Sequence, residues 1–186
     1  MLCAYLRMPY PPHPDEDAPV TEHLTWQANR EIRHTVIRTI RDHLLPTTPP
    51  DTSWSGYDLD FTGTVFDGGD FSDARFSGRV TFNNAEFADG IVSFQGACGG
   101  TVNFANSLFG SGAVSFTQAK FLGGTVDFTG VVFSSATVDF RRAGFTGGVV
   151  DLRNSHWLTP PVFDDDVLAD HRPGLLLPDR PPESAS

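Results

Sequence analysis

Phenylalanine recurs every five residues at Phe61, Phe66, Phe71 and Phe76, and this spacing excludes most regular folds. A step of five residues advances an α-helix by about 500°, so the rings would point in different directions around the helix. On a flat strand, an odd step alternates between the two faces. A chain that turns a corner after every five residues can point each ring at a common axis. The spacing therefore predicts a multi-sided β-solenoid.

From Val80 onward, the repeat lengthens to units of twelve residues with the form V-x-F-x-x-A-x-F-x-G-G-x, which equal two pentads plus two residues. The residue two positions before each ring is usually small or β-branched, so it shares the inward face of the chain with that ring. The inserted Gly123-Gly124 and Gly147-Gly148 pairs are predicted at alternate corners, in two opposite columns of loops. These units are also compatible with a flatter, two-sided roll. The predicted core ladder consists of Phe61, Phe66, Phe71, Phe76, Phe82, Phe87, Phe94, Phe104, Phe109, Phe116, Phe121, Phe128, Phe133, Phe140 and Phe145.

One unit of the repeat, residues 92–101, has ten residues instead of twelve. When this unit is aligned with the twelve-residue units on Ala97 and Gly99, the second phenylalanine and the residue after it are missing next to Cys98. We expect a shortened side and a thin core at this position. Inserting phenylalanine and one further residue after Cys98 should then raise the free energy of unfolding by up to ~1.5–3 kcal/mol, the contribution of one well-buried ring.

Outside the repeat, composition indicates accessory segments. Dense prolines after position 8 end any helix in the leader, which is predicted to be a linker. Apolar residues at three- and four-residue spacings then predict an amphipathic helix, with Thr21 as its N-cap, that covers one end of the solenoid. Its apolar stripe is Leu24, Ala28, Ile32, Val36, Ile37, Ile40 and Leu44, and its solvated face carries Arg30, Arg33, Arg38 and Arg41.

Candidates for capping the other end are Trp157, Leu158, Val162, Phe163 and the acidic segment after them. The predicted boundaries are a Pro-rich leader at 1–20, the helix at 21–45, a loop at 46–58, the β-solenoid at 59–157 with about four and a half coils, a C-terminal cap at 158–172 and a disordered tail at 173–186.

Charge and cysteine content limit the functions open to the chain. The net charge is -10, with 23 acidic against 13 basic residues, so direct binding of nucleic acid or anionic lipid is not expected. Cys3 and Cys98 are far apart and predict free, buried thiols in a reducing compartment. No apolar run reaches the ~20 residues needed to cross a bilayer. These features together predict a cytoplasmic protein.

Units such as Ala74-Arg75-Phe76-Ser77-Gly78 and Gly69-Asp70-Phe71-Ser72-Asp73 resemble the pentapeptide-repeat family, whose units read A-(D/N)-(L/F)-x-x. The resemblance implies a right-handed quadrilateral β-helix over residues 59–157. The later Gly-Gly-spaced units look like the actinobacterial branch, in which membrane-spanning segments often precede the solenoid and a Leu-Cys-Ala-Tyr-Leu-Arg-like stretch ends the helical region between them. Because that stretch begins this chain at Leu2, the resemblance suggests an N-terminally shortened version. The longer native form would be membrane-associated.

The resemblance and the regular repeat together favour a non-enzymatic scaffold that binds an unknown protein partner, with a homodimer through a solenoid end as a further possibility. Some family members mimic duplex DNA and bind type II topoisomerases such as gyrase, which is the alternative function. A third hypothesis is the soluble portion of a membrane-tethered protein. The acids of the repeat are interrupted by bases, so we expect most of them to face water and keep the surface soluble. Those acids are Asp58, Asp60, Asp67, Asp70, Asp73, Glu86, Asp89, Asp127, Asp139 and Asp151.

Neither a metal site nor a catalytic site is indicated. The histidines form no H-x-x-x-H pair or cluster with cysteine, and the acidic run from Asp164 lacks the alternating ligands of a calcium loop. The sequence has no nucleophile elbow or phosphate-binding glycine loop. We therefore expect no cofactor, no metal and no enzymatic activity. The histidines are His13, His23, His34, His43, His156 and His171, and the acidic run comprises Asp164, Asp165, Asp166 and Asp170.

Overall fold

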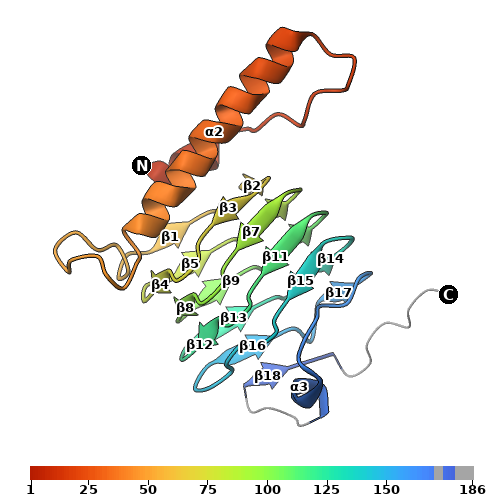
Figure 1. The fold of residues 1–186 in the computed structure, drawn as a ribbon. Helices are drawn as coiled ribbons and strands as arrows, with labels where there is room; N and C mark the ends of the chain where they lie inside the picture. Colours follow the sequence, from red (N-terminus) through yellow and green to blue (C-terminus); the bar gives the residue numbers. More distant parts are fainter. Residues whose placement is uncertain (170–173, 179–186) are drawn as a thin grey trace.

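The computed structural model describes residues 1–169 and 174–178. Short parallel strands wind around four sides of a column in about five turns (Figure 1). The predicted β-solenoid is confirmed. Because the strands form four separate sheets, the flatter two-sided roll is excluded.

Each sheet contains one strand from each successive coil, paired in parallel with the strands before and after it. Sheet A contains β1 (Leu59–Asp60), β5 (Val80–Thr81), β9 (Val102–Asn103), β13 (Thr125–Asp127), β16 (Val149–Asp151) and β18 (Leu175–Leu176). Sheet B contains β2 (Val65–Phe66), β6 (Glu86–Phe87), β10 (Leu108–Phe109), β14 (Val132–Phe133) and β17 (His156–Trp157). Sheet C contains β3 (Gly69–Asp70), β7 (Ile91–Ser93), β11 (Ala113–Ser115) and β15 (Thr137–Asp139). Sheet D contains β4 (Arg75–Phe76), β8 (Cys98–Gly99) and β12 (Lys120–Phe121).

The phenylalanine rings stack inside the column, one above another from coil to coil. In the column that follows sheet A, the ring centroids of Phe61, Phe82, Phe104 and Phe128 are 4.9 Å apart at each step. This separation matches the spacing of about 4.8 Å between neighbouring strands, so each ring rests on the one below it. The residues two positions before the rings are also buried, among them Ala74, Val80, Ala85, Val102, Val114, Ala119, Val126, Val138, Ala143 and Val150.

The inserted residues lie at two opposite corners of the column. Gly123-Gly124 and Gly147-Gly148 stack at the corner between sheets D and A, where a Cβ atom on Gly148 would lie 3.2 Å from the backbone nitrogen of Gly123. The corner between sheets B and C holds Gly90 and Gly112. Gly112 has a φ of +75°, and a Cβ atom there would collide with the carbonyl oxygen of Gly90. Glycine is needed at this corner because of both the dihedral angle and the close backbone approach.

The short unit differs from the prediction. Gly99 pairs with Phe76 of the coil before and with Phe121 of the coil after, so glycine occupies the ring position itself. The two missing residues fall at the next corner, where only residues 100–101 separate Gly99 from Val102. The alignment that placed a deleted ring after Cys98 is therefore wrong. The absent ring leaves an apolar cavity of about 30 Å³, which is much smaller than a phenylalanine side chain.

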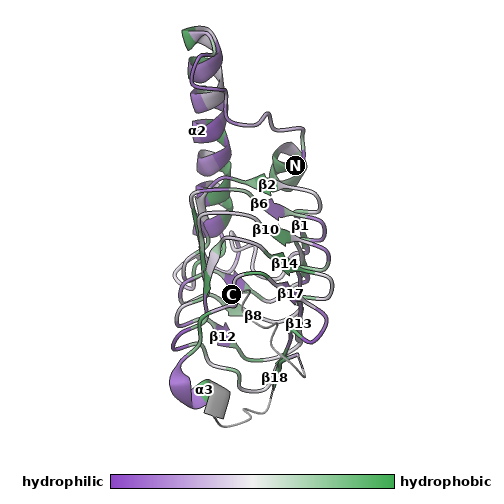
Figure 2. Cartoon of the chain, turned by 90° about the vertical axis from the view of Figure 1, so that its right-hand side faces the viewer, coloured by the Kyte–Doolittle hydropathy of each residue, from purple (hydrophilic) through white to green (hydrophobic). Residues whose placement is uncertain are grey.

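Two helices cover the first coil. The leader was predicted to be a linker, but its helix α1 (Leu2–Leu6) contacts β1 and α2 and buries Leu6 completely. Helix α2 (Val20–Asp42) has Pro19 rather than Thr21 at its N-cap. Ile37 and Ile40 are buried against the solenoid, whereas other apolar residues are exposed because the N-terminal half of α2 extends past the first coil (Figure 2). Leu24, in that half, is 59 % exposed. Ile32 is 51 % exposed although the next residue, Arg33, is buried.

The solenoid continues beyond the predicted boundary at Trp157. Val162 forms a parallel bridge with Asp139, and the ring of Phe163 stacks on Phe140 with centroids 5.1 Å apart. Helix α3 (Asp165–Ala169) follows. The prediction of disorder from 173 onward is wrong for residues 174–178, because β18 pairs with β16 and Leu175 is buried. Residues 170–173 and 179–186 lie outside the described part of the chain. Leu158, a predicted cap residue, is 76 % exposed.

Candidate functional site

The outward side chains of sheets A and C bond to the chain's own backbone. In sheet A, the Asp127 carboxylate accepts a hydrogen bond of 2.8 Å from the backbone N–H of Thr129, two residues further on. In sheet C, Asp70 accepts the same bond from the N–H of Ser72, at 2.8 Å. These side chains therefore hold the turn that follows each strand. The residues with this bond are Asp60, Asn103, Asp127 and Asp151 in sheet A and Asp70, Ser93, Ser115 and Asp139 in sheet C.

The acids of these two sheets do not form continuous columns. Neutral Thr81 and Asn103 separate Asp60 from Asp127 in sheet A, and two serines separate Asp70 from Asp139 in sheet C. The last acid in each strand column is also paired with arginine. Arg141 Nη2 lies 2.6 Å from Asp139 Oδ2, and Arg153 Nη2 lies 2.7 Å from Asp151 Oδ2. Hydrogen bonds from these arginines are the main reason that the pKa values of both carboxyls lie below the ordinary aspartate value.

Sheet B has different chemistry on its outer face. Three aliphatic side chains, Val65, Leu108 and Val132, lie in register with Glu86 and His156, and Figure 2 looks onto the strands that carry them. Leu108 is 38 % exposed, and both valines are partly exposed. None of these three aliphatic groups holds a following turn by a hydrogen bond. Sheets A and C also carry exposed aliphatic groups, Val149 and Ile91, but each begins its strand, and the turn is held by the last residue of that strand. The sheet B face is therefore not required for the turns.

A groove of about 600 Å³ lies at the N-terminal end of the sheet B face, between the leader, α2 and the first two coils. Its walls include the rings of Tyr10, His13 and Trp26, and its floor includes Val65 and Glu86. The His13 ring meets Trp26 edge-on, with centroids 4.5 Å apart. The indole Nε1 of Trp26 is buried and has no hydrogen-bond partner in the described structure. The groove thus presents aromatic surface and an acidic side chain, and the unpaired indole N–H lies buried behind this surface.

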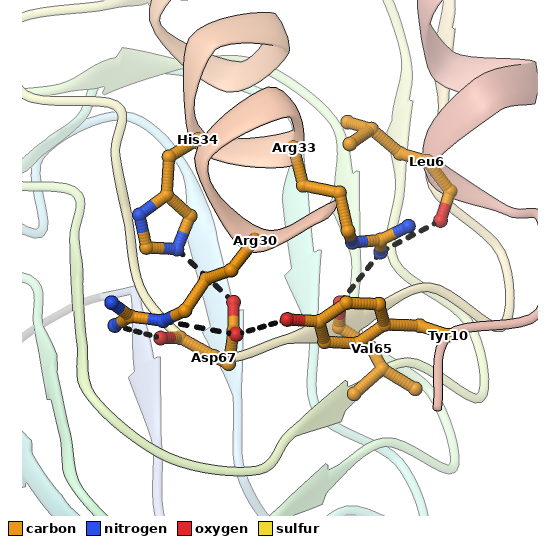
Figure 3. Close-up of polar contacts among 7 residues, drawn as sticks. All are labelled: Leu6, Tyr10, Arg30, Arg33, His34, Val65 and Asp67. Carbon is orange, nitrogen blue, oxygen red and sulfur yellow. Dashed lines mark hydrogen bonds and ion pairs between the residues drawn. The ribbon is translucent and has the colours of Figure 1, made fainter. Parts of the chain in front are cut away.

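A polar cluster below the groove attaches α2 and the leader to the first coil (Figure 3). Tyr10 Oη donates to Asp67 Oδ2 at 2.5 Å, and Arg30 Nε donates to the same oxygen at 3.2 Å. His34 Nε2 lies 3.0 Å from Asp67 Oδ1, and Arg30 Nη2 donates to the backbone oxygen of Asp67 at 3.1 Å. One carboxylate therefore connects three side chains from two segments that precede the solenoid.

The pKa of Asp67 reflects two opposed effects. Burial would raise this pKa, because the charged form is less well solvated inside the protein. Hydrogen bonds from His34 and Tyr10 and the charges of His34 and Arg30 together outweigh burial, so the pKa of Asp67 lies below its ordinary value. The same burial and the bond to Asp67 raise the pKa of Tyr10. The ionised carboxylate is thus the form that fits the cluster.

Two residues of this region differ from the sequence predictions. Arg33, placed on the solvated face of the helix, is only 4 % exposed and donates to the backbone oxygens of Leu6 at 2.9 Å and Val65 at 2.8 Å. Asp67, counted among the outward acids, is 7 % exposed. The helical spacing could have indicated that Arg33 is buried, because it lies four residues before Ile37 and therefore on the same, buried face of the helix. The sequence could have marked Asp67 as an exception, because small residues, Ala88 and Gly110, occupy the same position in later coils.

The remaining site predictions have mixed outcomes. Cys3 and Cys98 are both free, as predicted, but each is partly exposed rather than buried. His34 belongs to the Asp67 cluster, and the His43 ring stacks on Trp54 with centroids 3.9 Å apart. Within residues 1–169 and 174–178, no three His, Cys, Asp or Glu side chains converge as metal ligands would. None of the described helices is both long and apolar enough to cross a bilayer.

Comparisons with known proteins agree with the observed fold. Residues 61–111 match the family model of pentapeptide repeats, which contains nine copies of the unit. No curated protein and no solved structure matched the chain. Beyond residue 111, the same strand register continues through β12 to β17. Residues 61–111 therefore consist of pentapeptide repeats, and the later coils continue the same architecture.

Proposed function

We propose that the protein is a non-enzymatic scaffold that binds a protein partner along the sheet B face and the adjoining groove. The observation that carries this proposal is the difference between the faces. On sheets A and C, the outward residue that ends most strands holds a turn of the solenoid, whereas three of the five outward residues of sheet B are aliphatic and hold no turn. Exposed aliphatic groups beside an aromatic groove are typical of a surface that recognises protein segments.

The charges around the groove indicate the chemistry of the partner. Glu86 and Asp89 line the groove, and its cation, Arg30, is already bonded to Asp67. With a net charge of -10, the whole chain also attracts basic partners. The groove is lined by aromatic rings and prolines. Such a surface can bind an extended peptide segment that carries proline or aliphatic side chains. We therefore expect the partner segment to carry lysine or arginine next to such residues.

Selection from a random peptide library displayed against the full chain tests this proposal. Basic, aliphatic or proline-containing peptides should be enriched, and L108E and E86K should each weaken their binding by about tenfold or more. The matched control is T81K, because Thr81 faces outward from sheet A in the same coil as Glu86. Enrichment of acidic peptides, or equal binding by L108E and wild type, would overturn the proposal.

Topoisomerase binding by DNA mimicry is the alternative function, and the geometry supports it less well. The acids of sheets A and C form no continuous column, because neutral residues interrupt them, and they are bonded to the chain itself. A gyrase supercoiling assay with excess protein decides between the two functions. We expect no change in supercoiling, and concentration-dependent inhibition would favour the alternative. Membrane tethering of a longer native form is a separate proposal, which fractionation of the native host tests.

A further inference from the structure

The outer face of sheet D carries two cations on either side of a thiol. Arg75 in β4 pairs with Cys98 in β8, and Cys98 pairs with Lys120 in β12, so the three side chains leave the sheet in one column. Neighbouring strands are about 4.8 Å apart, which places the two cationic residues roughly 10 Å apart at the backbone. Both side chains are long enough to meet above the short Cys98 side chain between them.

Both cations are exposed and unpaired. Among the described residues, neither Arg75 nor Lys120 forms a side-chain hydrogen bond or ion pair, although the chain has 23 acidic residues. By contrast, Arg30, Arg41 and Arg141 all lie beside a carboxylate. Two free cations on either side of one residue repel each other, so an anion between them would be stabilising.

The cations border a hollow of about 630 Å³ that results from the short second coil. Its floor includes Gly99 and Gly100, which have no side chains to fill it, and Leu122 forms part of its wall. One acid, Asp73, also lines the hollow. The space is larger than a phosphate ion requires, so the hollow can also hold the organic group to which a phosphate is attached.

We propose that this hollow binds a phosphate monoester, with its oxyanion between Arg75 and Lys120 above the Cys98 thiol. A phosphate monoester carries a charge between about -1.5 and -2 at neutral pH and presents three acceptor oxygens, so it can accept bonds from both cations at once. A single carboxylate carries a charge of only about -1. The glycine floor keeps the approach to the cations open. This site is independent of the sheet B face and does not rest on the proposed function.

The Cys98 thiol reports occupancy of the site. In the C3S variant, Cys98 is the one cysteine of the chain, so its alkylation by iodoacetamide can be followed by intact mass. O-phosphoserine and a phosphoserine peptide should slow the reaction in a saturable way, whereas serine and the unphosphorylated peptide should not. Protection by O-phosphoserine and inorganic phosphate to the same degree would support the oxyanion site and assign its ligand to free phosphate. Stronger protection by the peptide would assign it to a phosphorylated protein.

Variants of the cations separate binding from nonspecific effects. R75Q together with K120Q should weaken the apparent affinity by about tenfold or more, because two charge-assisted hydrogen bonds are lost. R79Q is the matched control, since Arg79 is exposed but does not line the hollow. Melting temperatures measured alongside verify that both variants are folded. Absence of protection at millimolar O-phosphoserine, or equal protection in the double variant, would overturn the proposal.

Discussion

Sheets A and C differ from sheets B and D in what their outward side chains do. On sheets A and C, the outward residue that ends most strands is Asp, Asn or Ser, and it accepts a hydrogen bond from the backbone two residues later. On sheets B and D, the outward positions vary among aliphatic, acidic, basic and sulfhydryl groups. The repeat therefore places its structural requirement on two opposite faces. The other two faces can change chemistry without losing the turns.

The difference explains why acidic residues are frequent in this repeat without forming an acidic surface. Asp127 is needed for the turn at Thr129, so its charge is a consequence of its capping role. Asn103 performs the same task in the coil before, with a bond of 2.7 Å to the N–H of Ala105. A high content of acidic residues in such a solenoid therefore indicates residues that hold turns. It indicates a binding surface only where an acid accepts no hydrogen bond from the backbone.

Replacing a stacked ring in the interior of the solenoid should have the largest effect on the free energy of unfolding. Phe109 is fully buried, and its ring lies 4.5 Å from Phe87 and 5.0 Å from Phe133 between centroids. Phe109→Ala should lower the free energy of unfolding by about 3–5 kcal/mol, as measured by urea denaturation. Phe163→Ala, at the end of a column with one stacked neighbour, should lose less. Equal losses at both positions would contradict the stacked-column description.

Asp67 is the acid that departs from the turn-capping pattern, and its replacement should have the next largest effect. Asp67→Asn removes the charge that Arg30, His34 and Tyr10 surround, and it should cost about 2 kcal/mol. Hydrogen exchange should increase in α2 and the leader more than in the coils. The control is Asp70→Asn, whose side chain is 53 % exposed and should cost less. Uniform loosening of the solenoid would show that the cluster does not act on the cap.

The Asp67 cluster also predicts a dependence of stability on pH. The pKa of Asp67 is lower in the folded chain than the ordinary value of about 3.9, so its ionisation stabilises the fold above that value. This contribution should disappear as the pH falls through the lower, folded-state pKa. The stability difference between wild type and Asp67→Asn should therefore be constant near neutral pH and shrink in acid. A difference that grows on acidification would contradict the assignment.

The two kinds of face can be compared directly within the repeat. Asp127→Ala on sheet A removes a turn bond and should cost about 1 kcal/mol. Glu86→Ala on sheet B removes no such bond and should change stability by less than about 0.5 kcal/mol. Chemical denaturation of both variants provides the comparison. Similar costs at the two positions would remove the distinction between the faces.

A small gain in stability is expected at Gly99, where sheet D lacks a ring. A Cβ atom at this position would lie 3.4 Å from Val102 Cγ2 and 3.9 Å from Phe76 Cβ, and the residue does not have a positive φ. Gly99→Ala should therefore raise the free energy of unfolding by about 0.5–1 kcal/mol through cavity filling and lower chain entropy. Gly99→Phe should be less stable than Gly99→Ala, because a cavity of about 30 Å³ cannot hold a ring. A more stable Gly99→Phe variant would show that the column can reopen.

The repeated features could be predicted from the sequence, and the features that occur once could not. The five-residue spacing of Phe61 to Phe76 indicates a turning chain because each ring needs the same environment. The short coil was misaligned because the sequence does not show whether Gly99 replaces a ring or borders a deletion, and only strand register distinguishes these. The Asp67 cluster depends on contacts across 57 residues, from Tyr10 to Asp67 just after β2, which no local pattern encodes. Helix α1 was missed because the prolines after it concealed its short apolar face.

The role of the faces is tested most directly by measuring melting temperature and affinity for a selected basic peptide on L108E and D127A in parallel. We expect L108E to lose peptide binding by about tenfold or more while its melting temperature stays near that of wild type. D127A should bind the peptide like wild type and melt at a lower temperature. If D127A loses binding while L108E retains it, the division of the solenoid into structural and binding faces is contradicted.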